Sequence, residues 1–408
     1  MKVIFMQAVG VVVEFNPLHN GHIEHMRETR EISGREKIIA VMSGNFVQRG
    51  EPAICDKWRR TKMALLSGVD IVIEIPVPYV IAGADYFARA SVGLLAATDV
   101  VDALSFGSES GDIQAIKEAG RVLAEEPPMY KETLRKSLRK GQSFAAARGA
   151  ALETCLSEIS HFRCAKTFAK IPEGLLTKPN NCLAIEYCKA LRLLGVPMAI
   201  YTTHRKSGGP SATKTRREFF SAEPNDMNEH LPAHALEILK EARECGEIAT
   251  LDGFSDIFRY LLCTRDFNLG EGLENRFRKL CGNFSKISEF LTAVKTKRYT
   301  LTRLQRAVLG IILGISTADM DFYESNGGPG YIRVLGFRKE SADLLGEMTK
   351  KATLPVITHG AAIDTILLSG TASAKMLAKE LEAGDIYRCV TGHPGGYRSE
   401  RANGIIVM

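Results

Sequence analysis

Short apolar runs alternate with amphipathic segments along the first half of the chain. Five runs are rich in Val and Ile and almost continuously apolar, as strands are when a parallel sheet buries both of their faces. They are residues 9–15, 37–44, 69–76, 102–109 and 196–204. Segments with helical spacing fill the intervals, at residues 21–32, 56–67, 84–97, 112–125, 130–139, 143–154 and 181–194. The alternation predicts right-handed crossovers and a doubly wound parallel α/β sheet.

The second half of the chain follows another pattern. From about residue 226 the apolar positions have helical spacing, and no convincing strand precedes residue 330. After that residue, apolar runs mix with Gly-rich turns. A chain of 408 residues suits two or three domains. We predict an α/β domain over residues 1–225 and a mainly helical domain over residues 226–408.

Composition narrows the class of protein. The chain is 45% hydrophobic and 25% charged, which is typical of a folded, soluble protein. No apolar run reaches the roughly 18 residues of a membrane span, and the start of the sequence lacks a signal-peptide pattern. We therefore expect a cytoplasmic protein with no membrane partner. Nine cysteines without a C-x-x-C pair favour reduced thiols, and we expect Cys245, Cys263 and Cys281 to be small core residues.

Positive charge is unevenly distributed along the sequence. Of 53 Lys and Arg and 47 Asp and Glu residues, 30 and 24 fall in residues 1–225, which leaves 23 and 23 in the rest. Segments 131–148 and 286–306 each contain six basic residues and one acidic residue. Such clusters suit an anionic polymer as partner, although solvated helix faces are the commoner explanation of a charge run.

The stretch VVVEFNPLHNGH, residues 11–22, places two histidines directly after the first predicted strand. Ligands of parallel sheets bind at the carboxyl ends of strands, and Gly21 allows the backbone to approach one. The amides at the start of the following helix favour an anion. His19 and His22 can donate hydrogen bonds to a phosphate as charge builds on it. A His-x-Gly-His pattern alone is weak, but this position predicts a phosphate site.

A second candidate for phosphate binding is PSATKTRREFF, residues 210–220. Hydroxyl groups at the start of a helix, combined with Lys or Arg, suit the β- and γ-phosphates of a nucleotide. The hydroxyl candidates are Ser211, Thr213 and Thr215, interleaved with Lys214, Arg216 and Arg217. An ordinary helix cap with surface basic residues is the alternative. Because the histidines are predicted on the same sheet edge, we favour the phosphate clamp.

These motifs together resemble the HxGH nucleotidyltransferase superfamily, whose members have a Rossmann-like sheet, attack the α-phosphate of ATP and release pyrophosphate. Five further segments occur in the order found in bacterial tRNA(Met) cytidine acetate ligases. They are VMSGNFVQRGEPAICDKWRRTKMALLSGVDIVIEIP, FGSESGD, KPNNCLAIEY, YTTHR and VKTKRYTLTRLQR. The resemblance covers nearly the whole chain and thins after about residue 340.

The resemblance implies an ATP-dependent ligase that modifies tRNA. Acetate would be activated as acetyl-AMP, and the acetyl group would pass to N4 of the wobble cytidine of elongator tRNA(Met), giving N4-acetylcytidine. ATP would be a substrate, Mg²⁺ would accompany it, and we expect no dedicated metal site. His19 and His22 would be catalytic. The residues implied in ATP binding are Val9, Gly10, Val11, Val12, Val13, Glu14, Phe15, Asn16, Pro17, Leu18, His19, Asn20, Gly21, His22, Gly107, Asn180, Arg205, Thr215 and Arg216.

The resemblance implies that the basic segment 295–306 would bind tRNA. Cations there would meet the RNA backbone, and Tyr299 could stack on a base; the cations are Lys295, Lys297, Arg298, Arg303 and Arg306. Trp58 with Lys57, Arg59 and Arg60 is a second candidate surface, or else the packed start of a helix. This sequence departs from the family pattern at Lys214 and Thr215. The departure leaves open which hydroxyl of Ser211, Thr213 and Thr215 contacts phosphate.

Two alternative functions stay open at this point. A small-molecule nucleotidyltransferase acting on a phosphorylated metabolite would need only the α/β domain and would leave half of the chain unexplained. A non-catalytic tRNA-binding protein would have no need of an intact phosphate site. The presence of His19, Gly21, His22 and Arg216 argues against that second alternative.

Overall fold

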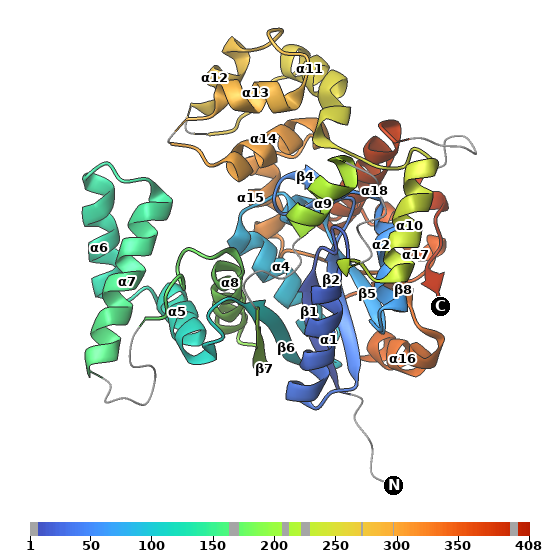
Figure 1. The fold of residues 1–408 in the computed structure, drawn as a ribbon, viewed down its shortest axis with the longest axis horizontal. Helices are drawn as coiled ribbons and strands as arrows, with labels where there is room; N and C mark the ends of the chain where they lie inside the picture. The colour runs from blue at the N-terminus through green and yellow to red at the C-terminus, as the bar shows by residue number, and fades with distance from the viewer. Residues whose placement is uncertain are drawn as a thin grey trace.

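The computed structural model describes residues 7–162, 171–205, 212–221, 229–270, 272–296, 298–391 and 399–408. A large sheet crosses the molecule in the order β10-β8-β5-β2-β1-β6-β7, with β9 paired to β8, and helices surround it (Figure 1). The strands are β1 (Ala8–Val13), β2 (Lys37–Ser43), β3 (Phe46–Val47), β4 (Glu51–Pro52), β5 (Ile71–Ile75), β6 (Val101–Ser108), β7 (Ala199–His204), β8 (Ile332–Phe337), β9 (Val356–Ile357) and β10 (Ile406–Val407).

The described helices of the first half are α1 (Asn20–Ser33), α2 (Lys57–Leu66), α3 (Val77–Val80), α4 (Ala84–Ala97), α5 (Ile113–Glu125), α6 (Pro128–Arg139), α7 (Phe144–Phe162), α8 (Pro179–Leu194) and α9 (Ala212–Ser221). Those of the second half are α10 (Ala233–Glu244), α11 (Ser255–Thr264), α12 (Leu273–Lys279), α13 (Ile287–Val294), α14 (Leu301–Leu313), α15 (Thr317–Ser325), α16 (Ala342–Lys351), α17 (Gly360–Leu368) and α18 (Ala372–Cys389). Short 3-10 turns lie at η2 (Leu251–Phe254), η3 (Lys339–Ser341) and η4 (Glu400–Ala402).

The predicted doubly wound sheet is confirmed. The five predicted strands are β1, β2, β5, β6 and β7, and neighbours among them pair in parallel. Alternate residues of a strand enter opposite cores: Ile39 and Val41 of β2 pack towards α4, whereas Ile38 and Ala40 pack towards α1 and α2. The order of strands changes direction between β1 and β6, which makes the carboxyl ends of these two strands the switch point where such sheets bind ligands.

The second half contains a helical body and a return to the sheet. Helices α11 to α14 enclose an aromatic core that includes Phe258, Phe277 and Phe290, and they gather at the top of Figure 1. Downstream of them, β8 pairs antiparallel with β5, and β10 pairs with β8. The sheet of the α/β domain proposed for residues 1–225 therefore includes strands from the far end of the sequence.

A buried ionic cluster joins these late segments to the early ones. Arg333 on β8 contacts Glu74 of β5 at 2.9 Å and Glu400 of η4 at 3.1 Å. Lys57 of α2 contacts the same two carboxylates at 2.5 and 2.8 Å. Burial and the nearby Glu74 raise the pKa of Glu380 well above its ordinary value. Since removing one partner of a buried ion pair is strongly destabilising, the cluster ties β5, β8 and η4 together.

The structure decides between the two interpretations of the Trp58 segment, in favour of the packed start of a helix, and it corrects an expectation about the cysteines. The segment around Trp58 is not a basic surface, because the side chains of Lys57 and Arg60 are fully buried. Arg60 instead donates to the carbonyl groups of Glu14 and Ser43, at the ends of β1 and β2. The expectation of reduced thiols, with Cys245, Cys263 and Cys281 as small core residues, is wrong. Cys263 and Cys281 form a disulfide, Cys263 is exposed, and Cys245 and Cys281 are half-buried.

The helices of the described residues are each too short or too polar to cross a bilayer. Nor do three or more His, Cys, Asp or Glu side chains of these residues come together in a way that would hold a metal ion.

Candidate active site

Helix α1 begins at the histidine motif. His19 precedes the helix in extended conformation, and its backbone N–H donates to Nδ1 of His22 at 3.1 Å. The N–H of His22 donates in turn to the carbonyl of His19 at 2.8 Å. Because Nδ1 of His22 accepts a hydrogen bond, the neutral ring carries its proton on Nε2. The motif therefore fixes the orientation of His22 and leaves one ring N–H as a donor.

The two imidazoles are packed together and are neutral. Their rings stack with centroids 3.7 Å apart, and Phe15 meets His22 edge-on at 5.1 Å. Burial, with the charge of Arg205, lowers the pKa of His19 to about 4. Burial and the neighbouring His19 lower the pKa of His22 well below 6.5. Nδ1 of His19 is buried with no partner among the described residues. Buried polar atoms are nearly always bonded, so this atom marks a functional candidate.

The loop between β1 and α1 is held by side-chain bonds. The Asn16–Pro17 peptide is cis, and the side-chain oxygen of Asn16 accepts the N–H of Ile54 at 2.7 Å. Residues Ala8–Val13 form β1 itself, in the middle of the sheet. Of the predicted nucleotide contacts Val9–His22, Val9 to Val11 are buried, and their strand is paired with β2 on one side and β6 on the other. Those after Val13 lie at the carboxyl edge.

Three further predicted residues lie together at the ends of β6 and β7. The N–H of Arg205 donates to the carbonyl of Ser108 at 2.8 Å, and its guanidinium donates to the side-chain oxygen of Asn180 at 3.3 Å. A side chain at Gly107 would place its Cβ 3.2 Å from Cγ of Arg205, so glycine leaves room for that arginine. The structure therefore brings Gly107, Asn180 and the exposed Arg205 to one place at the switch point.

A third histidine joins this group and was missed by the sequence analysis. Nδ1 of His25, one turn after His22 on α1, lies 2.7 Å from Oγ1 of Thr203. Burial and the charge of Arg205 lower its pKa to about 4. Arg205 also lowers the pKa of His19 and His22, so its charge reaches all three rings. The i, i+3, i+6 spacing of the histidines was the available signal, because it places them on one helix face.

The predicted phosphate clamp is only partly assembled. Arg216 on α9 donates to the carbonyl of Asn16 at 2.7 Å and contacts Glu51 at 3.2 Å, which fixes α9 against the histidine loop. Thr215 is fully buried, whereas Thr213 is exposed and accepts a bond from Arg49 at 3.2 Å. Ser211 lies outside the described residues. Thr213 is thus the more accessible hydroxyl of the two that are described.

Glu51 extends this contact to the helical body. One of its carboxylate oxygens contacts Arg216, and the other accepts a bond from the amide of Gln305 on α14 at 3.0 Å. A side chain at Gly50, where φ is +82°, would meet the backbone of Arg306 at 2.5 Å. The β3–β4 turn therefore packs closely against α14. It links the histidine loop to the helices of the second half, a role that the sequence analysis did not assign.

The residues predicted to bind tRNA divide into two groups. Lys295 and Arg298 are exposed, and Lys297 lies outside the described residues. Arg303 donates to the carbonyl of Leu269 at 2.7 Å, and Arg306 to that of Gln48 at 3.5 Å. Burial, with nearby Arg303, lowers the pKa of Arg306 to about 10, so that it stays cationic at pH 7. The last two arginines thus have structural contacts as well.

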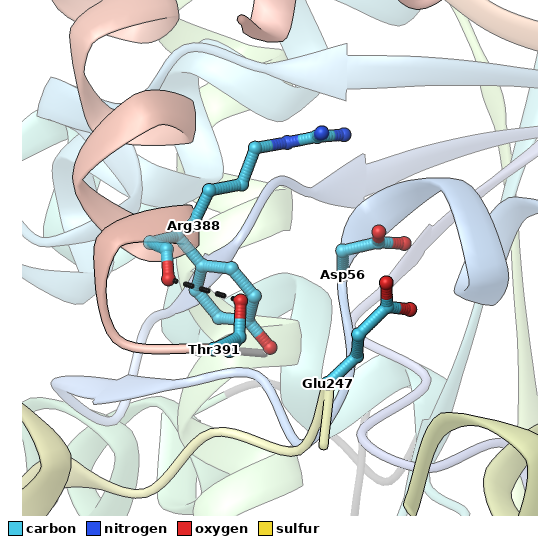
Figure 2. Close-up of a pocket in the computed structure, with 5 residues that line it drawn as sticks. Asp56, Glu247, Arg388 and Thr391 are labelled. Carbon is cyan, nitrogen blue, oxygen red and sulfur yellow. Dashed lines mark hydrogen bonds between the residues drawn. The ribbon is translucent and has the colours of Figure 1, made fainter. Parts of the chain in front are cut away.

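A small pocket in the molecule is lined by none of the histidines of the candidate site (Figure 2). Its volume is about 30 Å³, which suits a water molecule and not a nucleotide. It is lined by Asp56, Glu247, Tyr387, Arg388 and Thr391. Asp56 caps α2 by accepting the N–H of Arg59 at 2.8 Å, which accounts for its presence there. This pocket gives no alternative site for a nucleotide.

The arrangement at the switch point suits an anion on which charge develops. It combines the amides at the start of α1, neutral imidazole donors and the guanidinium of Arg205. Such groups are already oriented, and they stabilise charge on a phosphate without holding a metal. A Rossmann-like sheet with this motif after its first strand defines a nucleotidyltransferase.

Comparison with known proteins specifies the family. The family model described as HIGH Nucleotidyl Transferase matches residues 6–401. A tRNA(Met) cytidine acetate ligase of Thermoanaerobacter sp. (strain X514) is 37% identical, over 94% of this chain and 95% of that one. The enzyme of the same name from Acetivibrio thermocellus is 34% identical over 99% and 100%. The crystal structure of Thermotoga maritima TmcAL bound with alpha-thio ATP superposes with a TM-score of 0.90, at 32% identity, over 98% and 100%.

These matches extend over both halves of the chain and not only over the sheet. The chain belongs to the tRNA(Met) cytidine acetate ligase family of HIGH nucleotidyl transferases. The resemblance drawn from its motifs is thereby confirmed.

Proposed function

We propose that this protein activates acetate with ATP and transfers the acetyl group to N4 of the wobble cytidine of elongator tRNA(Met). The observation that carries the proposal is the cluster of His19, His22 and Arg205 at the switch point of a chain similar throughout to ligases of that name. The related Thermotoga maritima protein, crystallised with alpha-thio ATP, supports ATP as the nucleotide. Because tRNA is modified and used in the cytoplasm, the protein would act in that compartment.

In the first step a carboxylate oxygen of acetate attacks the α-phosphorus of ATP. The new O–P bond forms as the bond to the bridging oxygen breaks, and pyrophosphate leaves with that electron pair. Negative charge builds on the α-phosphate oxygens, where the Nε2–H of His22 and the amides of α1 would donate. Arg205 and Arg216 would hold the phosphates. Mg²⁺ would arrive with ATP, bound to its phosphates.

In the second step the amine of cytidine attacks the carbonyl carbon of acetyl-AMP. A C–N bond forms, AMP leaves, and the amine loses a proton. No enzyme thiol is required, and burial raises the pKa of Cys55 and of Cys188 to about 12, which makes both poor nucleophiles. Catalysis would rest on positioning and on stabilisation of charge.

The helical body would present the tRNA to this site. Lys295 and Arg298, both exposed, are the clearest candidates for phosphate contacts, together with Lys297. Arg303 and Arg306 would add charge from α14 while keeping their structural bonds. The link from Gln305 through Glu51 to Arg216 connects this surface to the nucleotide loop. Residues 1–225 would thus carry the ATP site, and the helices that follow would carry the tRNA surface.

Incubation with ATP, acetate and bulk tRNA tests the proposal. One acetyl group should be added to one cytidine of one tRNA species, which digestion and mass spectrometry would locate. Transcripts with uridine at the wobble position should be inert, because uridine has a carbonyl at position 4 and no amine. Acetylation of that transcript, or adenylyl transfer to a phosphorylated metabolite in place of any RNA product, would overturn it.

A further inference from the structure

A helical hairpin made of α6 and α7, residues 128–162, stands to one side of the sheet, on the left of Figure 1. Its two helices pack mainly against each other, and α7 also contacts α5. The inner face buries Tyr130, Leu152 and Leu156. The outer face near the turn between the helices contains the basic segment that the ATP site and the helical body do not account for.

Three cations of this hairpin lack a counterion. Arg135, Arg139 and Lys140 are exposed and make no ion pair with any residue that the structure describes. Other cations of the same segment are paired: Lys136 with Glu132 at 2.7 Å, and Arg148 with the buried Glu186. The contrast singles out three charges at the end of α6, which we call the hairpin triad.

The surroundings of the hairpin triad favour an anionic ligand. Arg135 and Arg139 are four residues apart on one helix, where like charges repel. The helix dipole favours cations in the last turn of α6 and accounts for part of the cluster. It does not account for the neighbouring Phe144, whose side chain is 63% exposed at the start of α7. An exposed aromatic ring beside unpaired cations is a combination that binds RNA, by stacking and by phosphate contact.

We propose that this hairpin is a second tRNA-contacting surface, in which the hairpin triad binds backbone phosphates and Phe144 packs on an unpaired base. The proposal rests on the proposed function and assigns it a surface apart from residues 295–306. In Figure 1 the hairpin and the helices α11–α14 project from different parts of the molecule. A membrane surface is less suitable, because it requires a row of apolar side chains along one helix face. A folded RNA would therefore be held at two places.

Equilibrium binding of tRNA tests this surface without relying on catalysis. The test variant is the triple substitution Arg135→Ala, Arg139→Ala, Lys140→Ala, and Phe144→Ala is made separately. The matched control removes three cations at η3 and at the end of α16, near the opposite edge of the sheet in Figure 1, by Lys339→Ala, Lys350→Ala and Lys351→Ala. Denaturant unfolding of every variant verifies that it is folded, independently of any activity.

The triple variant should bind tRNA at least tenfold more weakly at ~0.1 M salt, and its log–log salt slope should fall by about two to three. Phe144→Ala should weaken binding without changing the slope, since it removes no charge. The control should stay within about twofold of the wild type. Equal affinity of the triple variant and the control would overturn the inference, as would wild-type protein that binds no tRNA. Wild-type protein that binds tRNA but does not acetylate it would refute the proposed function alone, and the variants would still decide the role of the hairpin.

Discussion

Substitution of His22 separates the two tasks that the structure gives to this ring. Nδ1 accepts the N–H of His19 at the start of α1, and Nε2–H is the donor available to phosphate. In His22→Asn the side-chain oxygen stands near the position of Nδ1, so the bond to His19 is kept and the donor is lost. In His22→Ala both are lost, together with the ring stacked 3.7 Å from that of His19.

The two losses have different sizes. Loss of a bond at a helix start costs about 0.5–2 kcal/mol of stability. Loss of a donor to charge in the transition state slows reaction by roughly 10²–10³-fold, or about 2.7–4 kcal/mol. His22→Asn should therefore be nearly as stable as the wild type, and His22→Ala measurably less stable. Both should lose activity to a similar extent.

The assay is acetate-dependent release of pyrophosphate without tRNA, combined with denaturant unfolding of each variant. Both kcat and kcat/KM for ATP should fall together, because the donor acts in the transition state. His359→Asn is the matched control: Nδ1 of His359 also accepts a backbone N–H at a helix start, from Ala362 at 3.3 Å, and α17 carries none of the predicted site residues, so the rate should stay almost unchanged. Recovery of the rate in His22→Asn would mean that the ring only caps the helix. Normal release in His22→Ala would refute the phosphate role.

Three further outcomes are expected. Gly107→Ala should raise KM for ATP while leaving the unfolding free energy nearly unchanged, because its Cβ would crowd the flexible side chain of Arg205. Glu51→Gln should change KM for ATP by about threefold or more and alter stability by about 1 kcal/mol, the size of one lost hydrogen bond, because the half-buried Glu51 contacts both Arg216 and Gln305. Burial lowers the pKa of His25 from its ordinary 6.5 to about 4, so the unfolded chain binds the proton first, and stability should fall as pH drops from ~6.5 towards 4. Denaturant unfolding at pH 7.5 and 5 should show a smaller loss in His25→Asn than in the wild type.

The parallel strands and the histidine site could be read from local patterns. Strands such as Ile71–Ile75 are apolar on both faces, and only burial on both sides of a sheet accommodates that pattern. Carboxyl ends of parallel strands share one edge, which places the ends of β1, β6 and β7 on the same edge of the sheet. The family resemblance singled out Gly107 and Arg205, and their closeness to the histidines depends on the strand order β1-β6-β7.

Features that depend on distant partners could not be read in this way. Lys57 and Arg60 belong to a basic stretch that is typical of a surface, and their burial depends on acceptors elsewhere in the chain. Arg333 meets Glu74 across a separation of 259 residues. Residues 332–337 form a short apolar run whose pairing with β5 has no local signal. The role of Glu51 depends likewise on the approach of Arg216 and Gln305.

The return of β8 to β5 has a consequence for anyone who divides this protein into pieces. A fragment that ended near residue 225 would leave β5 as an open edge, with a row of unpaired backbone groups ready to pair with another copy. The same fragment would contain Lys57 and Glu74 but neither Arg333 nor Glu400. It would therefore leave the buried ionic cluster incomplete in an apolar interior. We expect such a fragment to be insoluble. The better dissection excises only helices α11–α14, which have their own aromatic core, and keeps α9 with Arg216 and α10 packed on the sheet.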